Sequence, residues 1–172
     1  MKGDAAAVKH WETGKGGGLW AAGVGGAITG KGFHLGIIDD PVKNAEEAGS
    51  NPLQEKQWDW FTSTFYTRAE PDAAIIVIQT RWNENDLSGR ILESEQDEPE
   101  RWHILHFEAI KEQEPPVYPP SCTVEPDFRK TGEALNPKRY TVAKLQKMAR
   151  KLGVYFWGAL FQQRPKPREG GM

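Results

Sequence analysis

The chain has almost no cysteine and no long apolar run, and these two absences exclude several classes of protein. Cys122 is the single cysteine among 172 residues, so an internal disulfide cannot form and a disulfide-stapled secreted scaffold is excluded. The longest apolar run, Ala73 to Ile78, is far shorter than the ~20 residues that span a bilayer. No charged-then-apolar signal segment opens the sequence. We therefore expect a soluble, intracellular protein that does not contact a membrane.

Length and composition favour one folded domain of the α/β class. The sequence is 38% hydrophobic and 10% aromatic, which is enough for a core and argues against a disordered chain. Apolar strand-like segments alternate with amphipathic helical segments. This alternation predicts a mostly parallel sheet with flanking helices.

The charges are strongly segregated although the net charge is only -2. Residues 84–127 carry 12 acidic and 3 basic side chains, whereas residues 128–168 carry 11 basic side chains and a single acidic one, Glu133. A basic segment of this kind can follow a phosphate backbone. The alternative is a solvated helix face that pairs with the preceding acidic stretch.

The first half of the chain contains two predicted strands joined by a helix. The glycine-rich first eighteen residues are expected to be an exposed lead-in, followed by a short strand over 19–24. An apolar strand over 35–38 ends at an acidic pair, and a strand over 73–79 is expected to be covered on both sides. Between them, Asn51 is expected to cap a helix whose first residue is Pro52. Its predicted buried face consists of Leu53, Trp60, Phe61, Thr64 and Phe65.

The second half is predicted to contain two helices and a further strand. Leu87, Ile91 and Leu92 mark an amphipathic helix, residues 102–110 a strand, and residues 112–125 a proline-rich loop. Thr141 is expected to cap a helix that Gly153 ends. Its buried positions are Val142, Leu145, Met148 and Leu152, and its outer side carries Lys144, Lys147, Arg150 and Lys151.

The sharpest chemical signal is the sequence Leu35-Gly36-Ile37-Ile38-Asp39-Asp40. A strand of a parallel sheet presents the residues that follow it at the carboxyl edge, where ligands bind in such folds. Of two adjacent carboxylates there, one can hold a magnesium ion and the other can orient or deprotonate an attacking water. The pattern has the form of a Walker B element, and its alternative is an ordinary strand-end turn.

A glycine-rich segment, residues 25–31, imitates a phosphate-binding loop without meeting its requirements. It fits G-x-x-x-x-G-K, but Gly32 stands where a magnesium-binding hydroxyl is needed. A phosphate-binding loop must also open a helix, whose N-terminal amides hold the phosphates. Here the segment runs directly into the strand over 35–38. The sequence therefore offers a Walker B candidate and no Walker A.

Taken together, these segments resemble the large terminase subunit of tailed bacteriophages. The ordered set of matching motifs extends from about Gly17 to Gly171. It comprises Val24-Gly25-Gly26-Ala27-Ile28-Thr29-Gly30-Lys31-Gly32, Ile37-Ile38-Asp39-Asp40-Pro41, Trp58-Asp59-Trp60-Phe61-Thr62-Ser63-Thr64, Gln79-Thr80-Arg81-Trp82-Asn83-Glu84-Asn85-Asp86-Leu87-Ser88-Gly89-Arg90, Leu135-Asn136-Pro137 and Phe161-Gln162-Gln163-Arg164-Pro165.

The resemblance implies a P-loop ATPase fold and roles for four residues. Asp39 corresponds to the magnesium-linked aspartate and Asp40 to the catalytic carboxylate beside it. Thr80 falls in the coupling motif that senses the γ-phosphate, and Arg81 next to it can contact phosphate or form a structural ion pair. By the same resemblance, residues 1–161 are the second half of an ATPase domain without its Walker A, and residues 162–172 lead toward an absent nuclease domain.

The resemblance also implies cofactors and partners. The full-length motor uses ATP and Mg²⁺, translocates double-stranded DNA, works with the small terminase subunit and the portal protein, and forms a homo-oligomeric ring in the host bacterial cytoplasm. The isolated chain is expected to hydrolyse ATP poorly or not at all. Two alternatives remain open: a fragment of a related helicase-like ATPase, and a non-catalytic module that binds DNA or a packaging partner through residues 128–168.

Overall fold

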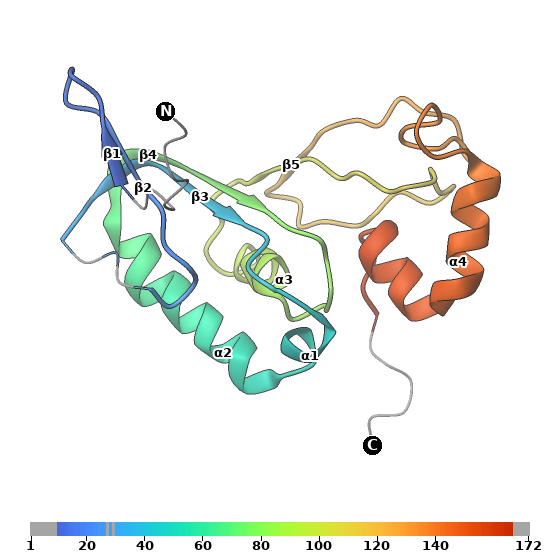
Figure 1. Cartoon of the computed structure of the whole chain (residues 1–172), viewed down its shortest axis with the longest axis horizontal. Coiled ribbons are helices and arrows are strands. Elements are labelled where there is room, and N and C mark those ends of the chain that lie inside the picture. Colours follow the sequence, from blue (N-terminus) through green and yellow to red (C-terminus); the bar gives the residue numbers. More distant parts are fainter. Residues whose placement is uncertain (1–9, 27, 29, 167–172) are drawn as a thin grey trace, which may run out of the picture.

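Two parallel strands connected by helices form the larger layer of the structure (Figure 1). The computed structural model describes residues 10–26, 28 and 30–166. Strand β3 (Phe33–Asp39) pairs in parallel with β4 (Ala69–Ile78), so that Leu35 lies opposite Ala74 and Asp39 opposite Ile78. Between them lie the short helix α1 (Ala45–Ala48) and helix α2 (Asn51–Trp60), which continues through the π-helical turn η1 (Phe61–Phe65) and the 3₁₀ turn η2 (Tyr66–Arg68). The predicted α/β class and the parallel pairing are confirmed.

One face of this sheet makes the hydrophobic core. Its inward residues, which include Ile38, Ile75 and Val77, pack against aromatic side chains of η1 and against α3 (Leu87–Ser94). The buried centre consists of Ile38, Phe61, Phe65, Leu87 and Ile91. These contacts confirm the predicted helix at residues 87–92 and the predicted core positions of the two phenylalanines.

The opposite face of the sheet is open, which corrects the prediction that the strand over 73–79 is covered on both sides. Burial alternates along β4, and Ile76 and Ile78 are 43% and 52% exposed. Leu35 and Ile37 of β3, on the same face, are 54% and 53% exposed. An apolar run of this kind is typical of a strand that is buried on both faces. In this structure, no described element packs on the second face.

Helix α2 starts one residue earlier than predicted. Ser50 is the N-cap residue and Asn51 the first helical residue, so Pro52 is the second helical residue and not, as predicted from the sequence, the first. The prediction that Leu53 is buried is wrong, because Leu53 is exposed and its neighbour Gln54 is buried instead. The amide of Gln54 explains this rotation of the helix, since it donates a 2.6 Å hydrogen bond to the carbonyl of Ala48.

An exposed hairpin precedes the sheet. Strand β1 (His10–Glu12) pairs antiparallel with β2 (Gly18–Trp20). Both strands are exposed, as the lead-in was expected to be, but β1 was not predicted and β2 is shorter than the expected strand over 19–24. The hairpin forms because Thr13 and Gly17 close the turn through backbone hydrogen bonds. The first nine residues of the expected lead-in lie outside the described residues.

The remainder of the chain forms a second layer beside the sheet (Figure 1). The predicted strand over 102–110 reduces to β5 (His103–Ile104), which pairs with β6 (Thr123–Val124) inside the segment expected to be a loop. Helix α4 (Val142–Phe156) is capped by the Thr141 side chain as predicted. Gly153 breaks its helical geometry with a φ of 76°, and the chain continues as the turn η3 (Trp157–Phe161). Within the described residues, no helix is long and apolar enough to cross a membrane.

Candidate nucleotide and metal site

The parallel pairing brings the acidic pair and the candidate coupling residue to one edge of the sheet. Asp39 is the last residue of β3, and the backbone N–H of Asp40 donates to the carbonyl of Ile78 at 2.7 Å. In return, the backbone N–H of Thr80 lies 3.4 Å from Oδ1 of Asp40. Two residues separated by forty positions in the sequence therefore contact each other at the carboxyl edge, where parallel sheets bind their ligands.

The backbone at this edge turns sharply at Asp40. Its φ of 45° lies in the left-handed region, which aspartate tolerates better than most residues. Both Asp39 and Asp40 are exposed. Because Asp39 opposes Ile78 in the register, it lies on the open face of the sheet. Carboxylate oxygens are the donors that Mg²⁺ prefers, so the chemistry of this pair fits a magnesium ion that keeps most of its water ligands.

Arg81 forms the structural ion pair that was the alternative to a phosphate contact. Its Nε lies 2.9 Å from both carboxylate oxygens of Asp86. Asp86 is 1% exposed and also accepts the backbone N–H of Gly89 at 3.0 Å, which caps α3. Arg81 thus fixes the turn between β4 and α3, and a direct role at phosphate remains a prediction.

The glycine-rich segment lies at the other edge of the sheet. Gly30, Lys31 and Gly32 lead directly into β3 without an intervening helix, and Nε of Arg68 donates to the carbonyl of Ile28 at 2.9 Å. The length of β3, about 20 Å at 3.3 Å per residue, separates this segment from Asp39. Ala27 and Thr29 lie outside the described residues. The described part of the segment thus lacks the helix N-terminus that a phosphate cradle requires.

A cavity of about 260 Å³ lies beside the end of β4, on the core side of the sheet. Its polar lining includes Gln79, Arg81, His106, Tyr118 and Gln163, and the rest of the lining is mostly apolar. Asp39 and Asp40 do not line it. The acidic pair is therefore an exposed edge site in this chain and not part of an enclosed pocket.

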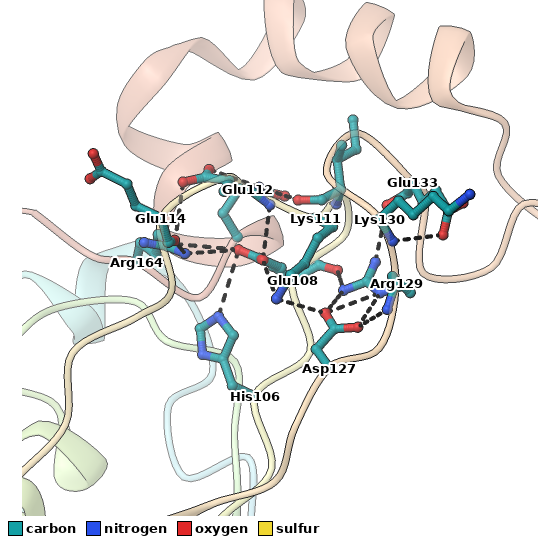
Figure 2. A network of polar contacts seen from close by, with 12 residues as sticks. His106, Glu108, Lys111, Glu112, Glu114, Asp127, Arg129, Lys130, Glu133 and Arg164 are labelled. Carbon is teal, nitrogen blue, oxygen red and sulfur yellow. Dashed lines mark hydrogen bonds and ion pairs between the residues drawn. The ribbon is translucent and has the colours of Figure 1, made fainter. Parts of the chain in front are cut away.

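A buried charge network that the sequence did not predict holds the second layer together (Figure 2). Glu108 is fully buried and accepts the backbone N–H of Glu112 at 3.0 Å. Its carboxylate lies 3.2 Å from Arg164 and 3.9 Å from each of Lys111 and His106. The sequence contained a signal for the burial of Glu108. Every second residue of the extended segment 102–108 lies on its inward side, and these residues are Trp102, Ile104, His106 and Glu108.

Two titratable groups in this network have shifted pKa values. The hydrogen bond from Arg129 lowers the pKa of Asp127 to about 2, with a 2.7 Å contact between Nη2 of Arg129 and Oδ2 of Asp127. Burial lowers the pKa of His106, against the opposing influence of Glu108. His106 is therefore neutral at pH 7, and its Nδ1 shares a 2.6 Å hydrogen bond with the Tyr118 hydroxyl.

The first residues after η3 are anchored to both layers. Gln162 is buried and its side chain forms hydrogen bonds with both backbone groups of Ile110. Oε1 of Gln163 accepts the backbone N–H of Arg81 at 2.9 Å, and Arg164 joins the network of Glu108. In the segment over 162–172, expected to be a linker, residues 162–164 thus pack on the domain, and residues 167–172 lie outside the described residues.

This arrangement is a partial NTPase-like α/β fold with an acidic pair at the carboxyl edge of a parallel sheet. A family model described as terminase large subunit, T4likevirus-type, N-terminal, matches residues 2–158. The match spans most of the chain, so the chain belongs to this family and is related to the large subunit that serves phage genome packaging. No curated protein gives a significant match.

Proposed function

We propose that this chain is the part of a terminase ATPase domain that carries the Walker B aspartates. In this proposal Asp39 holds a magnesium ion, Asp40 orients the attacking water, and Thr80 responds to the γ-phosphate. The observation that carries the proposal is the contact between the backbone N–H of Thr80 and Oδ1 of Asp40. It gives a direct route by which a change at the acidic pair reaches the neighbouring strand end. The family match favours this function over the helicase-like alternative.

The open face of the sheet supports the view that further structure covers this domain in the working motor. Parallel strands are found almost only in sheets that are covered on both faces. Leu35, Ile37, Ile76 and Ile78 form an exposed apolar surface on β3 and β4. We infer that the missing half of the ATPase domain, with its phosphate-binding loop, packs against this surface.

The chain alone is then expected to bind a magnesium ion and to hydrolyse ATP poorly. Its carboxylates suit the ion, but its described residues do not form a cradle for the phosphates. In the full-length motor, ATP and Mg²⁺ would act at this edge while double-stranded DNA is moved into the procapsid. We further propose the small terminase subunit and the portal protein as partners, a homo-oligomeric ring, and a site of action in the host bacterial cytoplasm.

The test measures nucleotide binding and hydrolysis by the purified chain. We expect weak binding of a fluorescent ATP analogue that requires Mg²⁺ and is lost in Asp39→Ala, together with hydrolysis no faster than the buffer control. Asp59→Ala, at an exposed aspartate of α2, is the matched control and should bind like the unmodified chain. Robust turnover that Asp40→Asn abolishes would refute the proposed inactivity. Binding that ignores both Mg²⁺ and Asp39 would refute the site.

A further inference from the structure

Two groups of basic residues in the last part of the chain differ in what they contact. Arg129 and Arg164 are internal: they pair with Asp127 and Glu108 inside the network of Figure 2. The second group lies on α4 and comprises Lys144, Lys147, Arg150 and Lys151, all exposed. Within the described residues, no carboxylate forms an ion pair with this second group. The acidic stretch therefore neutralises the first group, whereas the second group is available to bind an anionic partner.

The four cations of α4 lie on one side of an amphipathic helix. The helix buries Leu145 and half-buries Val142, Met148 and Leu152 on the opposite side. At 100° per residue, the four basic side chains occupy an arc of about 120°. Helix α4 contains no acidic residue. This surface, which we call the α4 basic face, is thus of a single charge sign.

The α4 basic face begins at the capped end of the helix and lies at the edge of the molecule. The Thr141 side chain accepts the backbone N–H of Lys144 at 3.3 Å and caps the helix. The ammonium group of Lys144 lies 4.7 Å from the centre of the Tyr140 ring. In Figure 1, α4 forms the end of the molecule opposite the β1–β2 hairpin, so the sheet does not cover its outer side.

We propose that the α4 basic face binds the phosphate backbone of double-stranded DNA. Lys144 and Lys151 are separated by about 10 Å along the helix axis. A DNA duplex carries about six phosphate charges over that length, whereas protein surfaces intersperse both signs. A uniform row of cations without carboxylate partners among the described residues therefore complements a duplex better than a protein surface. The proposal does not depend on the acidic pair of β3, because α4 lies in the other layer.

The experiment measures binding of the whole chain to a fluorescent 30-base-pair duplex of arbitrary sequence by anisotropy, between 50 and 200 mM NaCl. With four phosphate contacts, log Kobs should fall with log[salt] with a slope of about -3.6, or about 150-fold over this range. Each single alanine substitution on the α4 basic face should reduce the magnitude of the slope by about 1. Alanine is the best helix former, so the variants should keep the helix, which circular dichroism verifies.

Two matched variants separate this site from net charge and from the nucleotide site. K144A/K147A/R150A/K151A should lose duplex binding, whereas K15A/K43A/K56A/K130A, which removes the same charge from exposed positions elsewhere, should keep most of it. D39A/D40A should bind DNA like the unmodified chain. Equal losses in the two quadruple variants would overturn the proposal. The proposal would also be overturned if the α4 variant kept duplex binding and lost self-association in sedimentation velocity. That result would assign the α4 basic face to a protein contact.

Discussion

Oε1 of Gln163 accepts the backbone N–H of Arg81 at 2.9 Å, although 82 positions separate the two residues. The preceding amide, that of Thr80, faces Oδ1 of Asp40. Two consecutive amides after β4 therefore have side-chain acceptors from distant parts of the chain, Asp40 at the end of β3 and Gln163 after η3. Asp40 and Gln163 are thus linked through adjacent backbone positions.

The Gln163 contact predicts an unusual order of stability among three variants. Gln163 has a φ of 56°, which glycine adopts without the cost of about 1 kcal/mol or more that other residues incur. Q163A removes the acceptor and keeps the strain, so we expect a loss of about 1–2 kcal/mol in unfolding free energy. Q163G removes both and should be less destabilised. Q146A, at an exposed glutamine of α4, should be neutral. Urea denaturation measures the order, and a Q163G less stable than Q163A would contradict it.

The Arg81–Asp86 pair should be the most sensitive polar contact in the first layer. Asp86 is almost completely buried and accepts hydrogen bonds from Arg81, Trp82 and Gly89. D86A leaves a half-buried guanidinium unpaired and uncaps α3, so we expect a loss of about 3–5 kcal/mol. D97A, at an exposed aspartate after α3, should change stability by less than about 0.5 kcal/mol. Similar urea midpoints for D86A and D97A would show that the Arg81–Asp86 pair does not stabilise the fold.

Acid should destabilise the second layer in two stages. The folded pKa of His106 is lowered by burial, so the unfolded chain binds a proton first and stability falls as the pH drops below about 6.5. The pKa of Asp127 is about 2, so its contribution is present above about 4 and is lost as the pH falls toward 2. Because solvent screens part of this ion pair, we expect on the order of 1 kcal/mol from Asp127. H106N should reduce the pH dependence of the unfolding free energy between pH 7 and 5. D127N should reduce this pH dependence below pH 4. Unchanged profiles would contradict these assignments.

The open face of the sheet should tolerate polar substitution. I37T/I76T keeps branching at Cβ, and both side chains are about half exposed, so we expect less than about 1 kcal/mol of destabilisation. Binding of a dye specific for exposed apolar surface should decrease. The core variant I38T, whose parent side chain is 4% exposed, is the contrast and should lose several-fold more stability. A large loss in I37T/I76T would mean that this face is buried.

Local patterns predicted those elements whose signals are local. The structure contains α3 and α4 at the expected places. The spacing of Leu87 and Ile91 predicted α3, and the Thr141 cap with the apolar spacing that follows it predicted α4, because capping and periodicity are short-range properties. These predictions required no knowledge of distant contacts. The contact between Asp40 and Thr80, in contrast, depends on the parallel pairing of β3 with β4.

Features that depend on distant partners were missed. Leu53 was expected in the core, but the hydrogen bond from Gln54 to Ala48 sets a different helix face inward. The strand over 73–79 was expected to be covered, but no described element packs on its second face. Asp86 and Gln163 find their partners across turns or across the whole chain, so periodicity gives no indication that this carboxylate and this amide are held inside.

We propose that Asp39 and Asp40 bind a divalent cation at the carboxyl edge of β3 and β4. The most direct measurement adds substoichiometric Mn²⁺ to the ¹⁵N-labelled chain and maps paramagnetic broadening of backbone amide signals. We predict broadening centred on Asp39, Asp40 and Thr80 that excess Mg²⁺ reverses and that D39A removes, while D59A leaves it intact. Broadening confined to another acidic stretch, such as residues 93–100, and unchanged in D39A would show that the cation does not bind at Asp39 and Asp40.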